Sequence, residues 1–223
     1  LPTAIAPGLI VSIKGTGLGP PIGVTARPSA AGAIDTRLED IRVTFDGIPA
    51  PLLFVRFDQI NAIVPYSISG RVSARMQVES GTSFSIPIEL RVVDVAPGIL
   101  TTGGTGRGQA AALNQDLTPN AVSNPADRGA VVVIYGTGEG QTDPQGQDGR
   151  IIATDLRKPL VPVTATIGGK PADVLYLGSA SSLVSGVFQA NLRIPQDIEP
   201  GRVPVEIQIG GVATQGDVSI VVR

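Results

Sequence analysis

The sequence contains neither cysteine nor histidine, and these two absences exclude most catalytic chemistry. Without cysteine the chain has no disulfide, no thiolate nucleophile and no cysteine-bound metal. Without histidine it lacks the commonest general base and the commonest metal ligand, so serine–histidine triads and zinc hydrolase sites are ruled out. We therefore expect a protein that is not an enzyme and that carries no cofactor.

Aromatic residues and surplus charge are also scarce. Tryptophan is absent, and three Tyr and five Phe provide little material for stacking sugars or bases. The formal net charge is −2, from 17 basic and 19 acidic residues, so the chain has no basic field for a phosphate backbone. No apolar run approaches the roughly 20 residues that cross a bilayer. We expect no nucleic-acid partner and no membrane span.

The chain is instead rich in glycine and proline, with 28 and 19 residues respectively, and Val, Ile and Thr are abundant. This composition, combined with low charge, is typical of a secreted all-β protein. We therefore expect an extracellular protein located at the cell surface.

A glycine-centred motif occurs twice. Residues 10–20 (IVSIKGTGLGP) and 131–141 (VVVIYGTGEGQ) are both β-branched runs that end in a Gly-Thr-Gly turn. Their separation exceeds the roughly 20 to 50 residues of short repeat arrays, which indicates that a whole domain is copied. We expect an N-terminal domain at 1–95, a partly ordered linker at 96–129 and a C-terminal domain at 130–223.

Short alternating runs bounded by turn signals fill both halves. Asp46-Gly47 predicts a hairpin turn. Alternation predicts a strand at 86–95 with Ile86, Ile88, Leu90 and Val92 inward. The second half repeats the first, since QANLRIP at 189–195 matches QINAIVP at 59–65. About seven short strands per copy predict an all-β fold of two tandem immunoglobulin-like β-sandwich domains.

The second half also resembles a known family. The resemblance is carried by residues 95–100, 108–116, 131–141, 168–172 and 189–195. These strings are similar to the Solibacter-type C-terminal domain of secreted acidobacterial proteins, and the first half resembles the IPT/TIG-like immunoglobulin-like module that precedes it. The chain departs from that family ahead of Ile5, where an Asn-Ala-Ala-Ser type strand is missing. The resemblance implies an exported surface protein and no catalytic motif.

Two chemical sites can be considered around the second glycine turn. A dinucleotide loop would need a helix after residues 136–140, and the composition of 141–149 does not favour one. Glu139, Asp143 and Asp148 form an acidic loop that is a candidate calcium site. They lack the ligand spacing of an EF-hand, and a solvated loop is the alternative. The same carboxylates could be a glycosidase pair, but no spacing specifies one.

Polar residues repeat within the apolar strands. Gln59 with Asn61, and Gln189 with Asn191, occupy matching positions in the two halves. We expect their amides to satisfy backbone groups at turns or strand edges.

Two functions remain open from the sequence. The first is a structural subunit of a surface filament or layer, which binds copies of itself head to tail by strand addition. Two prolines in residues 1–8 rule out a helix there and leave an edge strand or an extended arm. The arm that adds to a neighbour would consist of Leu1, Pro2, Thr3, Ala4, Ile5 and Ala6. The alternative is an adhesin or carbohydrate-binding module that binds surface glycans through the loops at 20–34 and 141–150.

Overall fold

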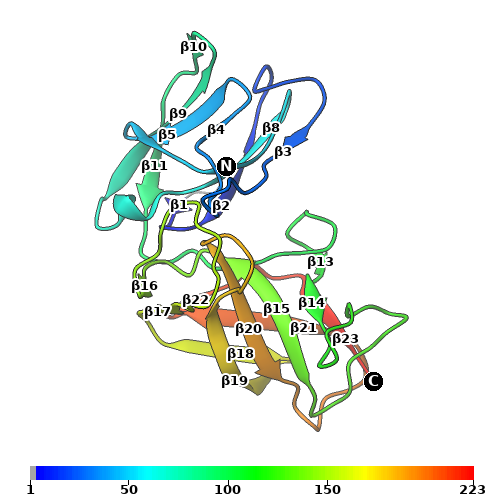
Figure 1. Cartoon of the computed structure of the whole chain (residues 1–223). Coiled ribbons are helices and arrows are strands. Elements are labelled where there is room, and N and C mark those ends of the chain that lie inside the picture. Colours follow the sequence, from blue (N-terminus) through cyan, green and yellow to red (C-terminus); the bar gives the residue numbers. More distant parts are fainter. Residues whose placement is uncertain (1–3) are drawn as a thin grey trace.

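The computed structural model describes residues 4–223, and these residues form an almost purely β structure (Figure 1). The helical element in this range is a short 3-10 turn, η1, at Tyr66–Ile68. No helix in the described part is long and apolar enough to cross a membrane. The two halves form separate sheets around separate cores, so the fold is the predicted pair of immunoglobulin-like β-sandwiches.

Two sheets pack face to face in the N-terminal domain. The seven-stranded sheet follows the order β1-β11-β9-β5-β4, with β10 paired to β9 and β6 paired to β5. Its strands are β1 (Ala4–Ile5), β4 (Arg37–Leu38), β5 (Ile41–Phe45), β6 (Ile48–Pro49), β9 (Ser73–Ser80), β10 (Ser83–Phe84) and β11 (Ile88–Val92). The four-stranded sheet, in the order β2-β8-β7-β3, comprises β2 (Ile10–Lys14), β3 (Val24–Thr25), β7 (Leu52–Arg56) and β8 (Gln59–Ile63). Side chains of both sheets share one core.

The Asp46-Gly47 turn forms as predicted, but the strand that follows it is short. Both residues have positive φ, 50° and 79°, which is the geometry of the tight turns that hairpins prefer. β6 pairs with β5 over two residues, and β7 then belongs to the other sheet. The chain crosses between the sheets at Ala50, whose side chain is fully buried.

One ten-stranded sheet folds around the core of the C-terminal domain. Its order is β12-β15-β20-β19-β18-β21-β23-β13, with β14 paired to β15 and β22 paired to β21. The strands are β12 (Gly98–Ile99), β13 (Gly108–Gln109), β14 (Ala112–Leu113), β15 (Val131–Thr137), β18 (Val163–Ile167), β19 (Lys170–Ser179), β20 (Val187–Arg193), β21 (Gly201–Ile209), β22 (Val212–Ala213) and β23 (Val218–Val222). A separate pair consists of β16 (Thr142–Asp143) and β17 (Lys158–Pro159). Ile134, Phe188 and Ile207, from different parts of the sheet, meet in one core.

Residues 96–129, predicted as an interdomain linker, belong to the C-terminal domain. β12 and β14 pair with β15, and β13 pairs with β23. Ile99 and Ala110 lie in the core of that domain. Asn120 holds the segment to β23, because its amide donates to the carbonyl oxygen of Val221 and accepts from the Val221 N–H, each at 2.8 Å. The many glycines and asparagines of residues 96–129 therefore form turns and hydrogen bonds to the sheet, and the segment is not a free linker.

The N-terminal segment, predicted as an edge strand or an extended arm, is an edge strand of its own domain where it is described. β1 pairs in parallel with β11 in the register Ala4↔Arg91 and Ile5↔Val92. Ile5 and Ala6 have no exposed surface and lie in the core. Leu1, Pro2 and Thr3 are outside the described residues. The prediction of a free arm is therefore corrected for residues 4–6, because the domain uses their apolar side chains.

The inward stripe predicted at 86–92 is only half buried. Leu90 and Val92 face the core, whereas Ile88 is 44% exposed and Ile86 is 87% exposed. Among residues 4–223, β1 covers only the last two residues of the outer edge of β11. Alternation identifies the face of a strand, but it does not reveal where the opposite sheet stops.

Candidate functional site

The glycine turn at 136–140 lies in the seam between the two domains. Gly138 and Gly140 have φ of 82° and 77°. A Cβ at these positions would lie 2.0 Å from the carbonyl oxygen of Ala96 and 2.2 Å from that of Asp94. Only glycine fits, because neighbouring backbone occupies the space. No helix follows the turn in the described structure, so the dinucleotide alternative is wrong.

The first copy of the motif is also a turn, but it does not lie at the interface between the domains. It follows β2 as the second copy follows β15, which confirms a turn after an early strand in each sandwich. A Cβ at Gly17 would have no neighbour within 4 Å, although its φ of 70° is similar to that of Gly138. The duplicated sequence therefore has one exposed copy and one copy that joins the domains.

Thr137 makes the polar link at the same turn. The Ile10 N–H donates to Thr137 Oγ1 at 2.9 Å, which bridges the two domains. Thr137 Oγ1 in turn donates to the carbonyl oxygen of Gly186 at 2.7 Å. Thr137 is itself buried, and both hydrogen-bonding functions of its hydroxyl are used.

Tyr66, in η1, anchors the N-terminal domain in the seam. Its N–H donates to Asp148 Oδ1 and its carbonyl oxygen accepts from Gln141 Nε2, each at 2.8 Å. Ser185 Oγ donates to the buried phenol oxygen at 3.3 Å. The ring leaves no room for a side chain at Gly146, where a Cβ would lie 2.2 Å from Tyr66 Cε1. Sequence reasoning missed Tyr66, because a single tyrosine after a proline forms no pattern.

The structure does not bring the three predicted calcium ligands together. Within residues 4–223, no group of three acidic side chains could hold a metal ion. Glu139 is buried in the seam, Asp148 accepts the Tyr66 N–H, and Asp143 is exposed on β16. The calcium hypothesis is therefore wrong, because packing of the loop onto the N-terminal domain separates its carboxylates.

Glu139 is an unusual group for such a seam. Its side chain is 1% exposed, and Oε2 has no hydrogen-bond partner among the described residues. Burial raises the pKa of Glu139 to about 8, because a charged carboxylate loses its hydration there. Burial, and to a smaller extent the charge of Glu139, also raises the pKa of Tyr66 and Tyr176. Glu139 is thus neutral at pH 7, and alkaline conditions place a charge between the domains.

The two loops that were expected to bind a ligand instead pack against each other. Residues 20–34 and 141–150 are joined by an isolated β-bridge, and the Ile34 N–H donates to the carbonyl oxygen of Gly149 at 2.7 Å. Ile34 also belongs to an apolar cluster with members from both domains. The loops close the junction, which leaves less of their surface for a ligand than the sequence suggests.

Within the described residues, the repeated amides bond to each other and not to backbone groups, so that prediction is wrong. Gln59 Nε2 donates to Asn61 Oδ1 at 2.7 Å, and Gln189 Nε2 donates to Asn191 Oδ1 at 2.8 Å. Residues two apart in a strand share a face, which makes this pairing possible. Each pair therefore forms a small polar patch on the outer face of its sheet.

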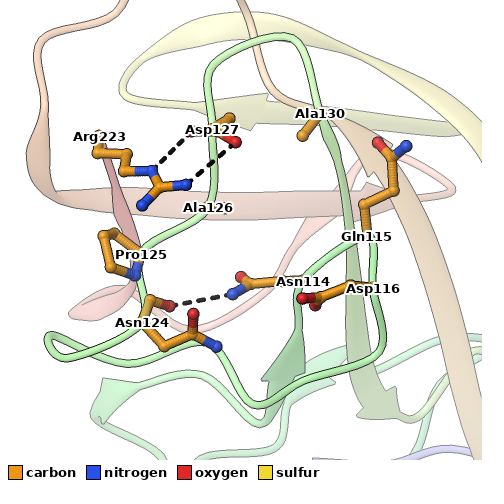
Figure 2. A pocket seen from close by; sticks show the side chains of 9 residues that line it. All are labelled: Asn114, Gln115, Asp116, Asn124, Pro125, Ala126, Asp127, Ala130 and Arg223. Atoms are coloured by element: carbon orange, nitrogen blue, oxygen red, sulfur yellow. Dashed lines mark hydrogen bonds and ion pairs between the residues drawn. The ribbon is translucent and has the colours of Figure 1, made fainter.

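A polar cavity of about 510 Å³ lies beside the end of β23 (Figure 2). It is lined by Asn114, Gln115, Asp116, Asn124, Pro125, Ala126, Asp127, Ala130 and Arg223. Arg223 Nε donates to Asp127 Oδ1 at 2.7 Å, and Asn114 Nδ2 donates to the carbonyl oxygen of Asn124 at 3.0 Å. Gln115 Oε1 accepts from the Val131 N–H at 3.0 Å. Much of the polar lining is thus used to tie the preceding loop to the sheet.

A family model described as the IPT/TIG domain matches residues 1–90. This match confirms the expected immunoglobulin-like module in the first half. The resemblance of the second half to the Solibacter-type domain stays a prediction. No curated protein matches the sequence.

Several solved structures are similar to the chain at low identity. The extracellular region of plexin A4 is 12% identical with a TM-score of 0.32, over 100% of this chain and 17% of that chain. The Bacteroides ovatus SGBP-B in complex with a mixed-linkage heptasaccharide is 11% identical with a TM-score of 0.37, over 99% and 43%. Domains 5–6 of the S-layer protein SbsC are 14% identical with a TM-score of 0.30, over 99% and 93%.

These likenesses are too distant to carry an argument about function. The chain also spans only 17% of the plexin chain and 43% of the SGBP-B chain. The conclusion that the geometry and the family model support together concerns architecture. The chain is an all-β protein of tandem immunoglobulin-like β-sandwiches, and its first domain matches the IPT/TIG module.

Proposed function

We propose that the chain is a non-catalytic extracellular structural protein that assembles head to tail with copies of itself into a surface filament or layer. Assembly occurs by exchange of β1 between neighbouring copies. The observation that carries the proposal is the pairing of this two-residue strand with the edge of β11. The lack of cysteine and histidine supports the absence of catalysis.

The edge of β11 is an acceptor that already fits the sequence of β1. The carbonyl oxygen of Ile5 accepts from the Val93 N–H at 2.9 Å, and Ile5 fills the core. When β1 leaves, it opens a gap that the same residues of another copy fill in the same way. Exchange of an identical element is a low-cost route to assembly, because the hydrogen bonds and burial given up within one copy are restored between copies.

The same edge offers more pairing than β1 uses. Residues 88–90 have no neighbour on that side within the described structure, and Ile86 and Ile88 are exposed beside them. An uncovered strand edge with apolar side chains favours strand addition.

The connection after β1 suits release of the strand. β1 and β2 belong to different sheets, and Pro7-Gly8 joins them, with Gly8 at φ 74°. Proline favours extended conformations of the residue before it, so Ala6 keeps a strand conformation when β1 detaches. If two copies do not exchange their strands mutually to form a closed dimer, the exchange continues from copy to copy and the product is a filament.

A cysteine pair across the β1–β11 contact tests the proposal. Ala4 and Arg91 face each other, and neighbouring strands lie about 4.8 Å apart, within the reach of a disulfide. The chain has no other cysteine, so the products are unambiguous. We expect the Ala4→Cys/Arg91→Cys chain, oxidised after assembly, to give a ladder of covalent multimers on a non-reducing gel.

The Arg91→Cys chain alone is the matched control, and it should give at most dimers. A double-cysteine sample that assembles but runs only as an internally bridged monomer would show that β1 stays paired with β11 of its own copy. A chain that stays monomeric at high concentration would also contradict the proposal.

A further inference from the structure

β19 and β20 run side by side in the C-terminal sheet (Figure 1). A shallow cavity lies over their outer face. Its volume is about 280 Å³, close to the lower end of the roughly 300 to 1,000 Å³ of small-ligand sites. The lining consists of Leu156, Tyr176, Ser179, Ser181, Gln189 and Asn191. None of these side chains carries a charge, so the cavity suits a neutral ligand.

The ring of Tyr176 is held in place at this cavity. β19 contains a bulge between Val174 and Tyr176, after which Tyr176 lies opposite Asn191. The phenol hydroxyl donates to the carbonyl oxygen of Ser179 at 2.8 Å, which fixes the ring. Tyr176 is only half buried, and Leu156 beside it is 46% exposed. A fixed and partly exposed aromatic ring is a preformed surface for apolar C–H groups.

The amides beside the ring have hydrogen-bonding capacity left over. Gln189 Nε2 uses one N–H for Asn191 Oδ1. Within residues 4–223, no partner bonds Gln189 Oε1 or Asn191 Nδ2. A primary amide has two donors and one acceptor oxygen, so the pair can both donate to and accept from hydroxyl groups.

The equivalent place in the N-terminal domain is filled by the chain itself. Phe54 lies opposite Asn61 after a bulge, as Tyr176 lies opposite Asn191. There, however, Ser12 Oγ donates to Asn61 Oδ1 at 2.9 Å, and Lys14 bonds to Gln59. Gly23 packs on the Phe54 ring so closely that a Cβ would lie 2.6 Å from Cζ.

The C-terminal copy lacks these internal partners. On β15, the residues opposite Asn191 and Gln189 are Val133 and Tyr135, where β2 has Ser12 and Lys14. Valine has no side-chain hydrogen-bonding group, so within residues 4–223 Asn191 Oδ1 accepts only from Gln189, and Gln189 Oε1 has no donor, whereas Gln59 Oε1 is bound by Lys14. The duplicated arrangement is thus closed in one domain and open in the other.

We propose that this open copy, the Tyr176 groove, binds a neutral oligosaccharide. One or two sugar rings stack their C–H face on Tyr176, and their hydroxyl groups bond to the amides of Gln189 and Asn191. Charged ligands are disfavoured because the groove has no counter-charge. The groove lies on a face of the C-terminal sheet, away from the β1–β11 contact in the N-terminal domain, so an assembled copy can still present it.

Calorimetric titration of the full chain tests the groove. The probes are six-residue neutral oligosaccharides with β-linkages (cellohexaose, laminarihexaose, xylohexaose) and α-linkages (maltohexaose, isomaltohexaose), each raised to millimolar concentration. We expect saturable binding of at least one probe. Tyr176→Ala and Asn191→Ala should each weaken it by about tenfold or more, because an anchoring ring or amide is removed.

Two further variants make the result specific. Asn61→Ala removes the matching amide of the closed copy and should leave affinity unchanged. Tyr176→Phe keeps the ring, so its affinity should stay within about threefold of that of the unchanged chain. Circular dichroism checks the fold of each variant. No saturable binding of any probe, or binding that survives Tyr176→Ala in a folded chain, would overturn the proposal.

Discussion

Gly138→Ala is expected to lower the melting temperature by about 6–12 °C, equivalent to about 3 kcal/mol for a chain of this size. The added Cβ would lie 2.0 Å from the carbonyl oxygen of Ala96 and 2.9 Å from Leu9 Cδ1. The first contact is with backbone, which cannot rotate away, and a φ of 82° strains alanine in addition. Thermal unfolding followed by circular dichroism measures the change.

Gly17→Ala is the matched control, because it alters the same position of the first motif copy. Its φ is 70°, but a Cβ there meets nothing within 4 Å. The expected cost is only the backbone strain, about 1 kcal/mol. Equal losses for the two variants would show that the seam contributes nothing beyond backbone conformation. Small-angle scattering is a separate test, because it shows whether Gly138→Ala weakens the contact between the two domains.

Glu139→Gln is expected to stabilise the chain at pH 9 by about 3–5 kcal/mol and to change it little at pH 5. Burial raises the pKa of Glu139 from its ordinary 4.5 to about 8, so the folded state binds a proton that the unfolded state has released. Stability therefore falls as pH rises from about 4.5 to 8, and the penalty is complete above that range. Glutamine has the shape of the protonated carboxyl and never acquires the charge.

Urea unfolding at pH 5, 7 and 9 measures this difference between the two chains. Asp143→Asn is the control, since Asp143 is exposed on β16 and its substitution should change stability little. A Glu139→Gln advantage that does not grow with pH would mean that the carboxylate is solvated when charged. The seam would then be open to water at Glu139.

The fold could be predicted from the sequence because its signals are local. Alternation, the Asp46-Gly47 turn and the duplicated Gly-Thr-Gly motif each act over a few residues, and all three appear in the structure. The N-terminal module was also recognisable, as the family match to residues 1–90 confirms.

The seam was not predictable, because its contacts join residues far apart in the chain. Tyr66 bonds to Asp148 and Ser185, which lie 82 and 119 residues later in the chain and belong to the other domain. The same docking buries Glu139, which as part of an acidic loop is expected to be a metal ligand or a solvated charge. No local pattern distinguishes a carboxyl that will be enclosed from one that will face water.

The difference between the two amide pairs escaped sequence reasoning for a related reason. The strings that begin at Gln59 and Gln189 share the glutamine, the asparagine and the closing proline, so they predict the same role for the amides. Their roles differ because the neighbouring strand supplies Ser12 and Lys14 in one domain and Val133 and Tyr135 in the other. Strand neighbours come from the topology, and a match between short strings does not include them.

Negative-stain electron microscopy of the Ala4→Cys/Arg91→Cys chain tests strand exchange most directly. The chain is oxidised as a monomer, which locks β1 to its own β11, and one half of the sample is then reduced. If β1 is exchanged between copies, the reduced half forms filaments or layers and the locked half stays monomeric. Polymers of equal length in both halves, or none in the reduced half, would contradict assembly by exchange of β1.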